Sequence, residues 1–159
     1  MTKIIGLTFT HLVALVIGVG IGIYSLPILV AEDGPTQASL VMAKRTAKYE
    51  AQFSPQRADS DFLHWGDASV FVGPHWIAWQ GHLAPGPRYR LYVSRQFIET
   101  EADFQQARGE MVDLGPVSSF GDYVVPVPEE LDIEEFSTLV VWCESFSQFI
   151  TSAQYKTHR

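Results

Sequence analysis

The first long pattern along the chain is an apolar segment without charged residues. Residues 4–31 contain no Asp, Glu, Lys or Arg. As a helix rising about 1.5 Å per residue they extend over roughly 42 Å, and about 20 residues suffice to cross the hydrocarbon core of a bilayer. The segment therefore predicts a transmembrane anchor with room for tilt. A signal peptide is the alternative, although its apolar region is normally only about 7–15 residues long.

The orientation of this anchor rests on few charges. Lys3 precedes it, and the basic residues at 44–48 lie near the limit of the zone that determines topology. Basic residues on the two sides of the anchor therefore favour opposite orientations under the positive-inside rule. A very short N-terminal tail is typical of a signal-anchor, which keeps the N-terminus in the cytoplasm. We therefore expect a single-pass membrane protein with its C-terminal domain on the extracytoplasmic side.

Residues 32–59 predict a short helical stalk and a linker. Thr36–Phe53 is rich in Ala, Lys, Glu, Gln and Leu, which are good helix formers. Asp33–Thr36 supplies a start signal and Ser54-Pro55 a stop signal. The stripe of Leu and Ala residues along this helix is too weakly apolar to form a core, so we interpret it as solvated. A membrane-surface or coiled-coil helix is the alternative.

Beyond residue 60 the helical period gives way to short strands. Segments rich in Val, Tyr, Phe and Trp are separated by Gly/Pro turns, which is typical of an antiparallel β-sandwich or barrel. We therefore predict a mainly β protein, with this domain at residues 60–156. Pro126 and Pro128 predict that the strand beginning at Tyr123 ends early or lies at a sheet edge. The predicted strands are Ala68–Val72, Trp76–Leu83, Tyr89–Ser94, Met111–Leu114, Tyr123–Val127 and Thr138–Cys143.

The last of these strands is apolar on both faces. Side chains alternate along a strand, so Cys143 shares a face with Leu139 and Val141, while the opposite face is equally apolar. We therefore expect a central strand that is covered on both sides. After it, apolar residues recur at helical spacing over 146–153 and predict a closing helical turn, with a final strand as the alternative.

Composition and charge exclude several classes of function. The chain carries a net charge of −7, and residues 54–159 hold fifteen acidic residues against seven Lys and Arg. Such an acidic domain does not suit phosphate backbones, so we expect no nucleic-acid binding. One cysteine forms no disulfide framework, and without Asn there is no N-glycosylation acceptor. The acidic run Glu129–Glu135 is interpreted as a solvated loop; calcium binding or docking to a basic partner is the alternative.

Cys143, the only cysteine, is the main candidate for chemistry. Its simplest interpretation is a small buried hydrophobic residue. A redox or ligating role requires a stabilised thiolate, yet no Lys, Arg or His lies within ten residues on either side, and Glu144 opposes the negative charge. Any activating cation must therefore come from elsewhere in the fold.

Cofactor ligands are not evident from the histidines. His64, His75 and His82 are the candidate partners of Cys143, with His158 near the C-terminus. They form no i, i+4 pair, and the chain has no Cys-x-x-Cys-His run. No metal site is expected, and the spacing does not support a haem ligated by Cys143. The usual catalytic motifs are also absent from the sequence, so a stand-alone enzyme is not indicated.

Several blocks of sequence, in order and with matching spacing over roughly residues 60–156, resemble the DM-thirteen domain, an electron-transfer module. The resemblance implies a β-rich domain whose single cysteine, Cys143 here, does redox work as a free thiol or as a ligand to a prosthetic group such as haem. It also implies an electron donor or acceptor in another protein. The blocks are Trp65–Ala68, Trp76–Gly81, Leu83–Pro87, Leu91–Ser94, Val112–Pro116, Tyr123–Pro126 and Val140–Phe146.

Two functional hypotheses follow. In the first, a membrane-anchored extracytoplasmic domain takes part in electron transfer or thiol redox through Cys143, together with a protein redox partner or another envelope protein. In the second, the domain is a non-catalytic envelope binding module in which the cysteine is structural. Gly18 and Gly22 match the close-packing motif of membrane helix pairs, but this motif is common in apolar segments, so the oligomeric state stays open.

Overall fold

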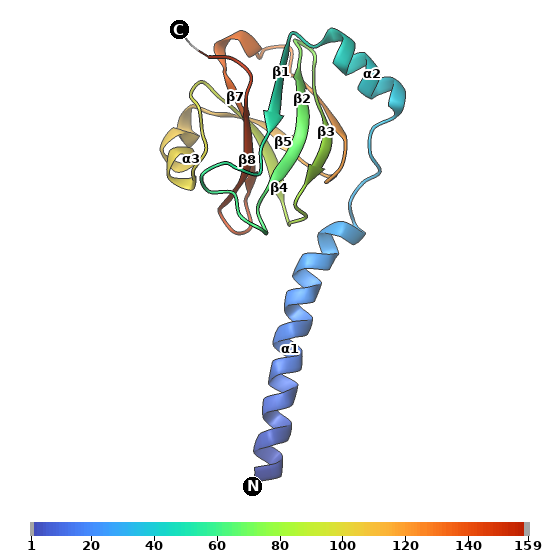
Figure 1. Ribbon diagram of the computed structural model, residues 1–159, viewed down its shortest axis with the longest axis vertical. Helices are drawn as coiled ribbons and strands as arrows, with labels where there is room; N and C mark the ends of the chain where they lie inside the picture. The colour runs from blue at the N-terminus through green and yellow to red at the C-terminus, as the bar shows by residue number, and fades with distance from the viewer. Residues whose placement is uncertain (1, 158–159) are drawn as a thin grey trace.

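The computed structural model describes residues 2–157, and a single long helix projects from one end of its β-domain (Figure 1). This helix, α1, spans Thr2–Leu29 and is exposed along almost its whole length. Among the described residues it is the one helix long and apolar enough to cross a membrane. Pro27 lies in its last turn, where the chain turns away from the helix axis.

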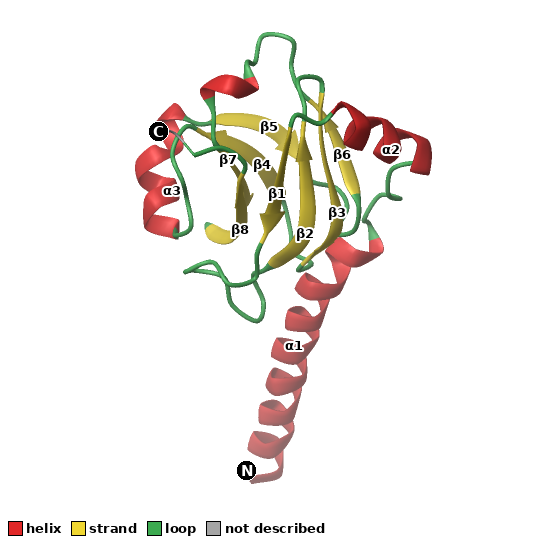
Figure 2. Cartoon of the chain, turned by 45° about the horizontal axis from the view of Figure 1, so that its top comes forward, coloured by secondary structure: helices red, strands yellow, loops and turns green. Residues whose placement is uncertain are grey.

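The domain is built from two four-stranded antiparallel sheets, so the predicted mainly β sandwich is confirmed (Figure 2). The order is β1-β2-β3-β6 in the first sheet and β5-β4-β7-β8 in the second. As predicted from Pro126 and Pro128, the strand that begins at Tyr123 lies at a sheet edge. The strands are β1 Tyr49–Phe53, β2 Gly66–Val72, β3 Trp76–Leu83, β4 Tyr89–Ser94, β5 Val112–Pro116, β6 Tyr123–Pro126, β7 Thr138–Cys143 and β8 Gln148–Gln154.

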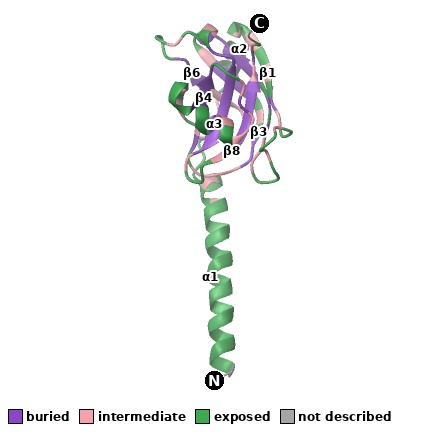
Figure 3. Cartoon of the chain, turned by 90° about the vertical axis from the view of Figure 1, so that its left-hand side faces the viewer, coloured by how far each residue is buried: buried purple, intermediate pink, exposed green. Residues whose placement is uncertain are grey.

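The main core lies between the two sheets, where the inward side chains of each strand meet. Trp79 is fully buried, packs edge-on against Phe53, and donates its indole N–H to the Gly121 carbonyl at 2.9 Å. A buried tryptophan thus keeps a partner for its one polar group. Figure 3 shows the buried strands above the exposed α1, which marks where the folding energy of the domain is concentrated.

A second, smaller core covers the outer face of β7. Helix α3, Glu101–Ala107, is capped by Thr100, whose side chain accepts from the Asp103 amide. Its Phe104 stacks on Trp142 with ring centroids 3.9 Å apart and planes inclined by 5°. Strand β7 is therefore covered on both faces, as its sequence predicts. Two 3-10 turns complete the elements, Arg108–Glu110 and Ile133–Glu135.

The helix predicted over Thr36–Phe53 is shorter than expected and is not solvated. Helix α2 spans Gln37–Thr46 and buries Leu40 and Ala43 against the outer face of the first sheet. The short helix itself is confirmed, and only its interpretation as solvated is wrong, because two side chains suffice to dock a ten-residue helix that is too weakly apolar to form a core alone.

The rest of that segment forms a strand instead of a helix. Tyr49–Phe53 pairs with β2 over its whole length, and its Phe53 is fully buried. Pairing with a neighbouring strand outweighs the helix propensity of the Glu, Ala and Gln residues between the two aromatic rings.

The C-terminal helical turn predicted over 146–153 is also wrong, and the alternative, a strand, is correct. Gln148–Gln154 forms β8, which is joined to β7 by a tight turn with Ser147 at φ 53°. All five residues at 149–153 are buried, so the strand lacks the alternation that would have identified it.

Candidate functional site

Cys143 is the last residue of β7, at the end of the inter-sheet core nearest to α1. Its side chain is only 1% exposed and belongs to the core cluster between the sheets. The thiol donates a hydrogen bond to the Pro87 carbonyl, with Sγ 3.2 Å from the oxygen. Across the strand pair it faces Tyr89. The sulfur is therefore a packed and partnered group at rest.

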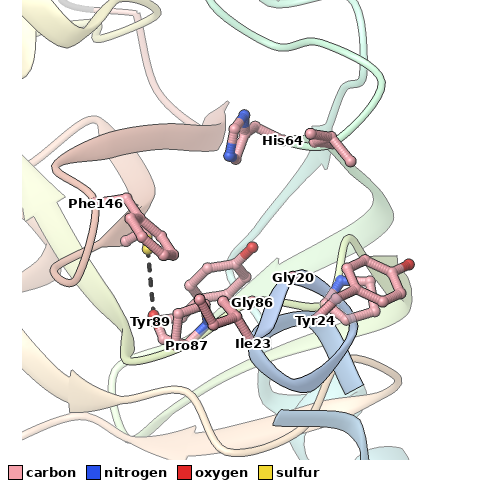
Figure 4. A pocket seen from close by; sticks show the side chains of 11 residues that line it. Gly20, Ile23, Tyr24, His64, Gly86, Pro87, Tyr89 and Phe146 are labelled. Atoms are coloured by element: carbon pink, nitrogen blue, oxygen red, sulfur yellow. Dashed lines mark hydrogen bonds between the residues drawn. The ribbon is translucent and has the colours of Figure 1, made fainter. Parts of the chain in front are cut away.

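A cavity of about 170 Å³ separates the sulfur from α1 (Figure 4). The sandwich contributes side chains from three segments, the loop before β2, the loop before β4 and the turn after β7. Helix α1 contributes residues from its C-terminal half. The lining residues are Gly20, Ile23, Tyr24, Leu63, His64, Pro85, Gly86, Pro87, Tyr89, Cys143 and Phe146. Cys143 is thus almost closed to solvent yet forms part of a cavity wall.

The electrostatics of the site keep this sulfur protonated. Burial raises the pKa of the Cys143 thiol above its usual value of 9.0, and the Glu144 carboxylate acts in the same direction. The backbone N–H groups of Phe146 and Ser145 and the charge of Arg88 favour the thiolate but do not outweigh burial. At neutral pH the group is therefore a neutral thiol.

Arg88 is the cation that the sequence around Cys143 lacks. It is exposed at the start of β4 and adopts φ 53°, a left-handed conformation that is uncommon for residues other than glycine. Its backbone carbonyl accepts a bond from the Glu144 amide at 3.2 Å, which fixes the loop against the end of β7. Long-range pairing of two strands thus supplies the charge, fifty-five positions away in the chain.

Glu144 is held away from the thiol by a polar network on the opposite face of β7. Tyr92 donates to its carboxylate at 2.6 Å, and Arg108 donates to both oxygens at 3.0 and 2.9 Å. Although burial opposes it, these bonds lower the pKa of Glu144 below 4.5. The carboxylate is therefore ionised but largely neutralised, which weakens the effect predicted from its position in sequence next to the cysteine.

The structure brings only one of the predicted histidines to this cavity. His64 lines it, and Nδ1 of its ring lies 3.1 Å from Asp61 Oδ2 in a tight loop. His75 and His82 are exposed and line other surfaces, while His158 lies outside the described residues. No group of three potential ligands converges among the residues that the structure describes.

A haem does not fit the residues around Cys143. The cavity of about 170 Å³ is smaller than the roughly 300–1,000 Å³ of pockets that hold drug-sized ligands. The thiol hydrogen is bound to the Pro87 carbonyl. The site therefore offers a protein thiol for chemistry, and we derive no step through a prosthetic group.

Gly86 and Tyr89 together shape the floor of the cavity. A Cβ atom on Gly86 would overlap the Tyr89 ring, so only glycine allows this close approach of the loop. Burial, and then the neighbouring Cys143, raise the pKa of Tyr89, so its phenol stays protonated. The sequence marks this loop only as a turn, and its role in lining the cavity becomes visible in the folded chain.

This arrangement defines a class of protein, a β-sandwich domain with one thiol at the edge of its core. Residues 59–155, more than half of the chain, match the family described as Electron transfer DM13. The chain belongs to this family, which confirms the resemblance found in its sequence and supports a general role in electron transfer or redox chemistry. No curated protein matches the chain, and no solved structure matches it.

Proposed function

We propose that the protein is a membrane-anchored, extracytoplasmic domain that takes part in electron transfer or thiol redox through Cys143. Membership of the Electron transfer DM13 family supports the redox role, and the long apolar helix α1 supports the anchor. The observation that carries the proposal is the position of the sulfur in the wall of the cavity between the sandwich and α1.

Burial of the thiol favours one form of this chemistry over another. Thiol–disulfide exchange needs the thiolate to reach a partner's disulfide, and a sulfur that is 1% exposed reaches none without opening of the cavity. Loss of one electron to an oxidised metal or haem centre of a protein partner, with release of the thiol proton to solvent, needs no such contact. The product is a neutral thiyl radical, and its reduction takes back one electron and one proton.

The test compares the full-length chain in lipid nanodiscs with its Cys143→Ser variant. We expect the parent to exchange electrons with soluble redox mediators in a spectroelectrochemical titration, and the variant to lose this signal while keeping its circular-dichroism spectrum. Equal electron exchange with the mediators by both proteins would overturn a redox role for Cys143. If Cys143→Ser does not fold, the thiol of the folded parent is alkylated instead and the titration is repeated on the alkylated protein.

The extracytoplasmic location has a separate test on the surface of the domain. Met42 on α2 is 49% exposed, and α2 lies at the end of the domain away from α1 (Figure 1). In the Cys143→Ser background, Met42→Cys should react with a membrane-impermeant maleimide in intact cells. Reaction only after the cells are opened would place the domain on the cytoplasmic side.

The second hypothesis, a non-catalytic envelope module with a structural cysteine, is favoured by a different observation. The thiol is buried, hydrogen-bonded to Pro87 and has a raised pKa, all of which suit a packing role. An unreactive thiol together with an unchanged redox titration in Cys143→Ala would support it.

A further inference from the structure

Three large hydrophobic side chains protrude from the described part of the sandwich, outside its helices. Phe62 is 85% exposed, Leu63 47% and Phe146 52%. They come from two segments far apart in sequence, the loop between β1 and β2 and the turn between β7 and β8. Figure 1 shows both segments at the end of the sandwich from which α1 projects. We call these three residues the base patch.

The base patch adjoins α1 directly. Leu63 and Phe146 line the same cavity as Ile23 and Tyr24 of α1. A second cavity of about 320 Å³ beside it is lined by Leu26, Pro27 and Val30 together with the loop that carries Arg88. Apolar surface of the domain is therefore continuous with apolar surface of the helix.

The position of this contact along α1 sets its depth in a membrane. If the hydrocarbon core begins just after Lys3, about 20 residues of helix end near Ile23. Tyr24 then lies at the interface, where aromatic side chains are enriched. Because Leu63 and Phe146 share a cavity with these two residues, they lie at the same level. If the membrane-spanning part of α1 instead lies closer to Glu32, the base patch lies deeper in the bilayer and not in water.

We propose that the base patch inserts into the interfacial region of the same bilayer that α1 crosses. This inference rests on the membrane anchor of the proposed function, and it adds a second contact between the domain and the lipid. Phe62 and Phe146 enter the boundary between headgroups and acyl chains. The domain thereby stands on the membrane and does not swing freely at the end of α1.

The charged groups around the base patch suit a lipid headgroup. Arg88 is exposed beside the second cavity and faces lipid phosphates from there. Asp61, next to Phe62, is an exposed carboxylate, and it accepts hydrogen bonds from the Leu63 and His64 amides at 2.7 and 2.8 Å. The rest of the domain is acidic, so we expect insertion into zwitterionic phosphatidylcholine without any need for anionic lipid.

Insertion also determines how Cys143 is reached. Its cavity is lined in part by Leu63 and Phe146 of the base patch and by Tyr24 of α1, and lipid covers these residues when the base patch is inserted. Access to the thiol is then through the membrane interface.

The experiment measures the depth of single nitroxide labels in the full-length chain. Cys143→Ser provides a cysteine-free background, to which Phe62→Cys or Phe146→Cys is added in phosphatidylcholine nanodiscs. We expect both labels to collide mainly with dissolved oxygen, which concentrates in lipid, and little with a water-soluble nickel complex. Met42→Cys, at the opposite end of the sandwich, is the matched control and should show the reverse.

A label at Val16→Cys, near the middle of α1, separates failure of this inference from failure of the anchor. Oxygen-accessible Val16 together with nickel-accessible base labels leaves the anchor intact and overturns insertion of the base patch. A nickel-accessible Val16 overturns the anchor itself, and the inference falls with it. If the cysteine-free background does not fold, Phe62→Trp in the native background should gain fluorescence that brominated phosphatidylcholine quenches; an unquenched signal overturns the inference.

Discussion

The two faces of β7 carry neighbouring residues in opposite situations. Trp142 is fully buried under α3, stacked on Phe104, in a closed hydrophobic cluster. Cys143, one residue further, is equally buried but lies against a cavity that α1 closes. One face is closed by a hydrophobic cluster and the other keeps a cavity beside the thiol. The comparison indicates that the α3 face holds the strand in place while the cavity face can serve chemistry.

The largest loss of stability is expected from a substitution on the face of β7 that α3 covers. Trp142→Ala removes the ring from the stack and leaves a cavity that neighbouring side chains fill only in part, so we expect a loss of about 3–5 kcal/mol in the free energy of unfolding. Chemical denaturation monitored by circular dichroism measures it. The indole N–H has no hydrogen-bond partner in the structure, so Trp142→Phe should cost much less. Equal losses in the two variants would show that the ring does not act by filling space.

Arg108→Ala tests the link between the two faces. It removes the bidentate partner of the half-buried Glu144, and we expect a loss of about 1–2 kcal/mol at neutral pH. The pKa of Glu144 is lowered in the folded state, so its contribution is complete above its unfolded pKa, about 4.5. This contribution is lost as the pH falls through the pKa of Glu144 in the folded state. The difference in free energy of unfolding between the parent and Arg108→Ala should therefore become smaller there.

The matched control for this change is Arg90→Ala, which removes a more exposed pair with Asp113. Because surface ion pairs contribute little, its effect should stay below about 1 kcal/mol. A larger loss in the control than in Arg108→Ala would contradict the special position of Glu144.

The environment of Cys143 on the cavity face should determine how its rate of alkylation depends on pH. Because the pKa of Cys143 is raised above 9.0, its reaction with iodoacetamide should accelerate about tenfold for each pH unit and should not level off at pH 9. This slope corresponds to about 1.4 kcal/mol for each unit. Met42→Cys in the Cys143→Ser background is the exposed comparison and should level off near the ordinary value. A plateau of Cys143 below pH 8 would mean that the cations and N–H groups outweigh burial.

The sequence predicts the cores of most strands because their signals are local. Trp76–Leu83 and Tyr89–Ser94 combine aromatic and β-branched residues with flanking Gly/Pro turns, and the structure reproduces both ranges. Strand β8 is not predicted from the sequence, because both of its faces are buried and its residues therefore do not alternate between apolar and polar. Helix α3 has only seven residues with Phe104 and Ala107 buried, too few for a period to be visible.

Of the candidate site, the sequence identifies only the cysteine. Cys143 is identified from its uniqueness and from the family resemblance, but its surroundings come from long-range pairing. Arg88 reaches it through the β4–β7 ladder, and the histidine that lines the cavity, His64, is no better marked in the sequence than the exposed His75. The contribution of α1 depends on how the helix meets the sandwich, which no local pattern encodes.

A small effect on the free energy of unfolding is expected at the sulfur itself. Cys143→Ala deletes one buried atom beside an existing cavity and leaves the Pro87 carbonyl without its donor, so the loss should be only about 1 kcal/mol. Cys143→Ser restores a donor but buries a more polar group and should fall in the same range. If the thiol serves redox chemistry, both variants lose electron exchange while remaining folded. A loss as large as that of Trp142→Ala would instead show that the sulfur fills space as Trp142 does, and the contrast between the two faces of β7 would disappear.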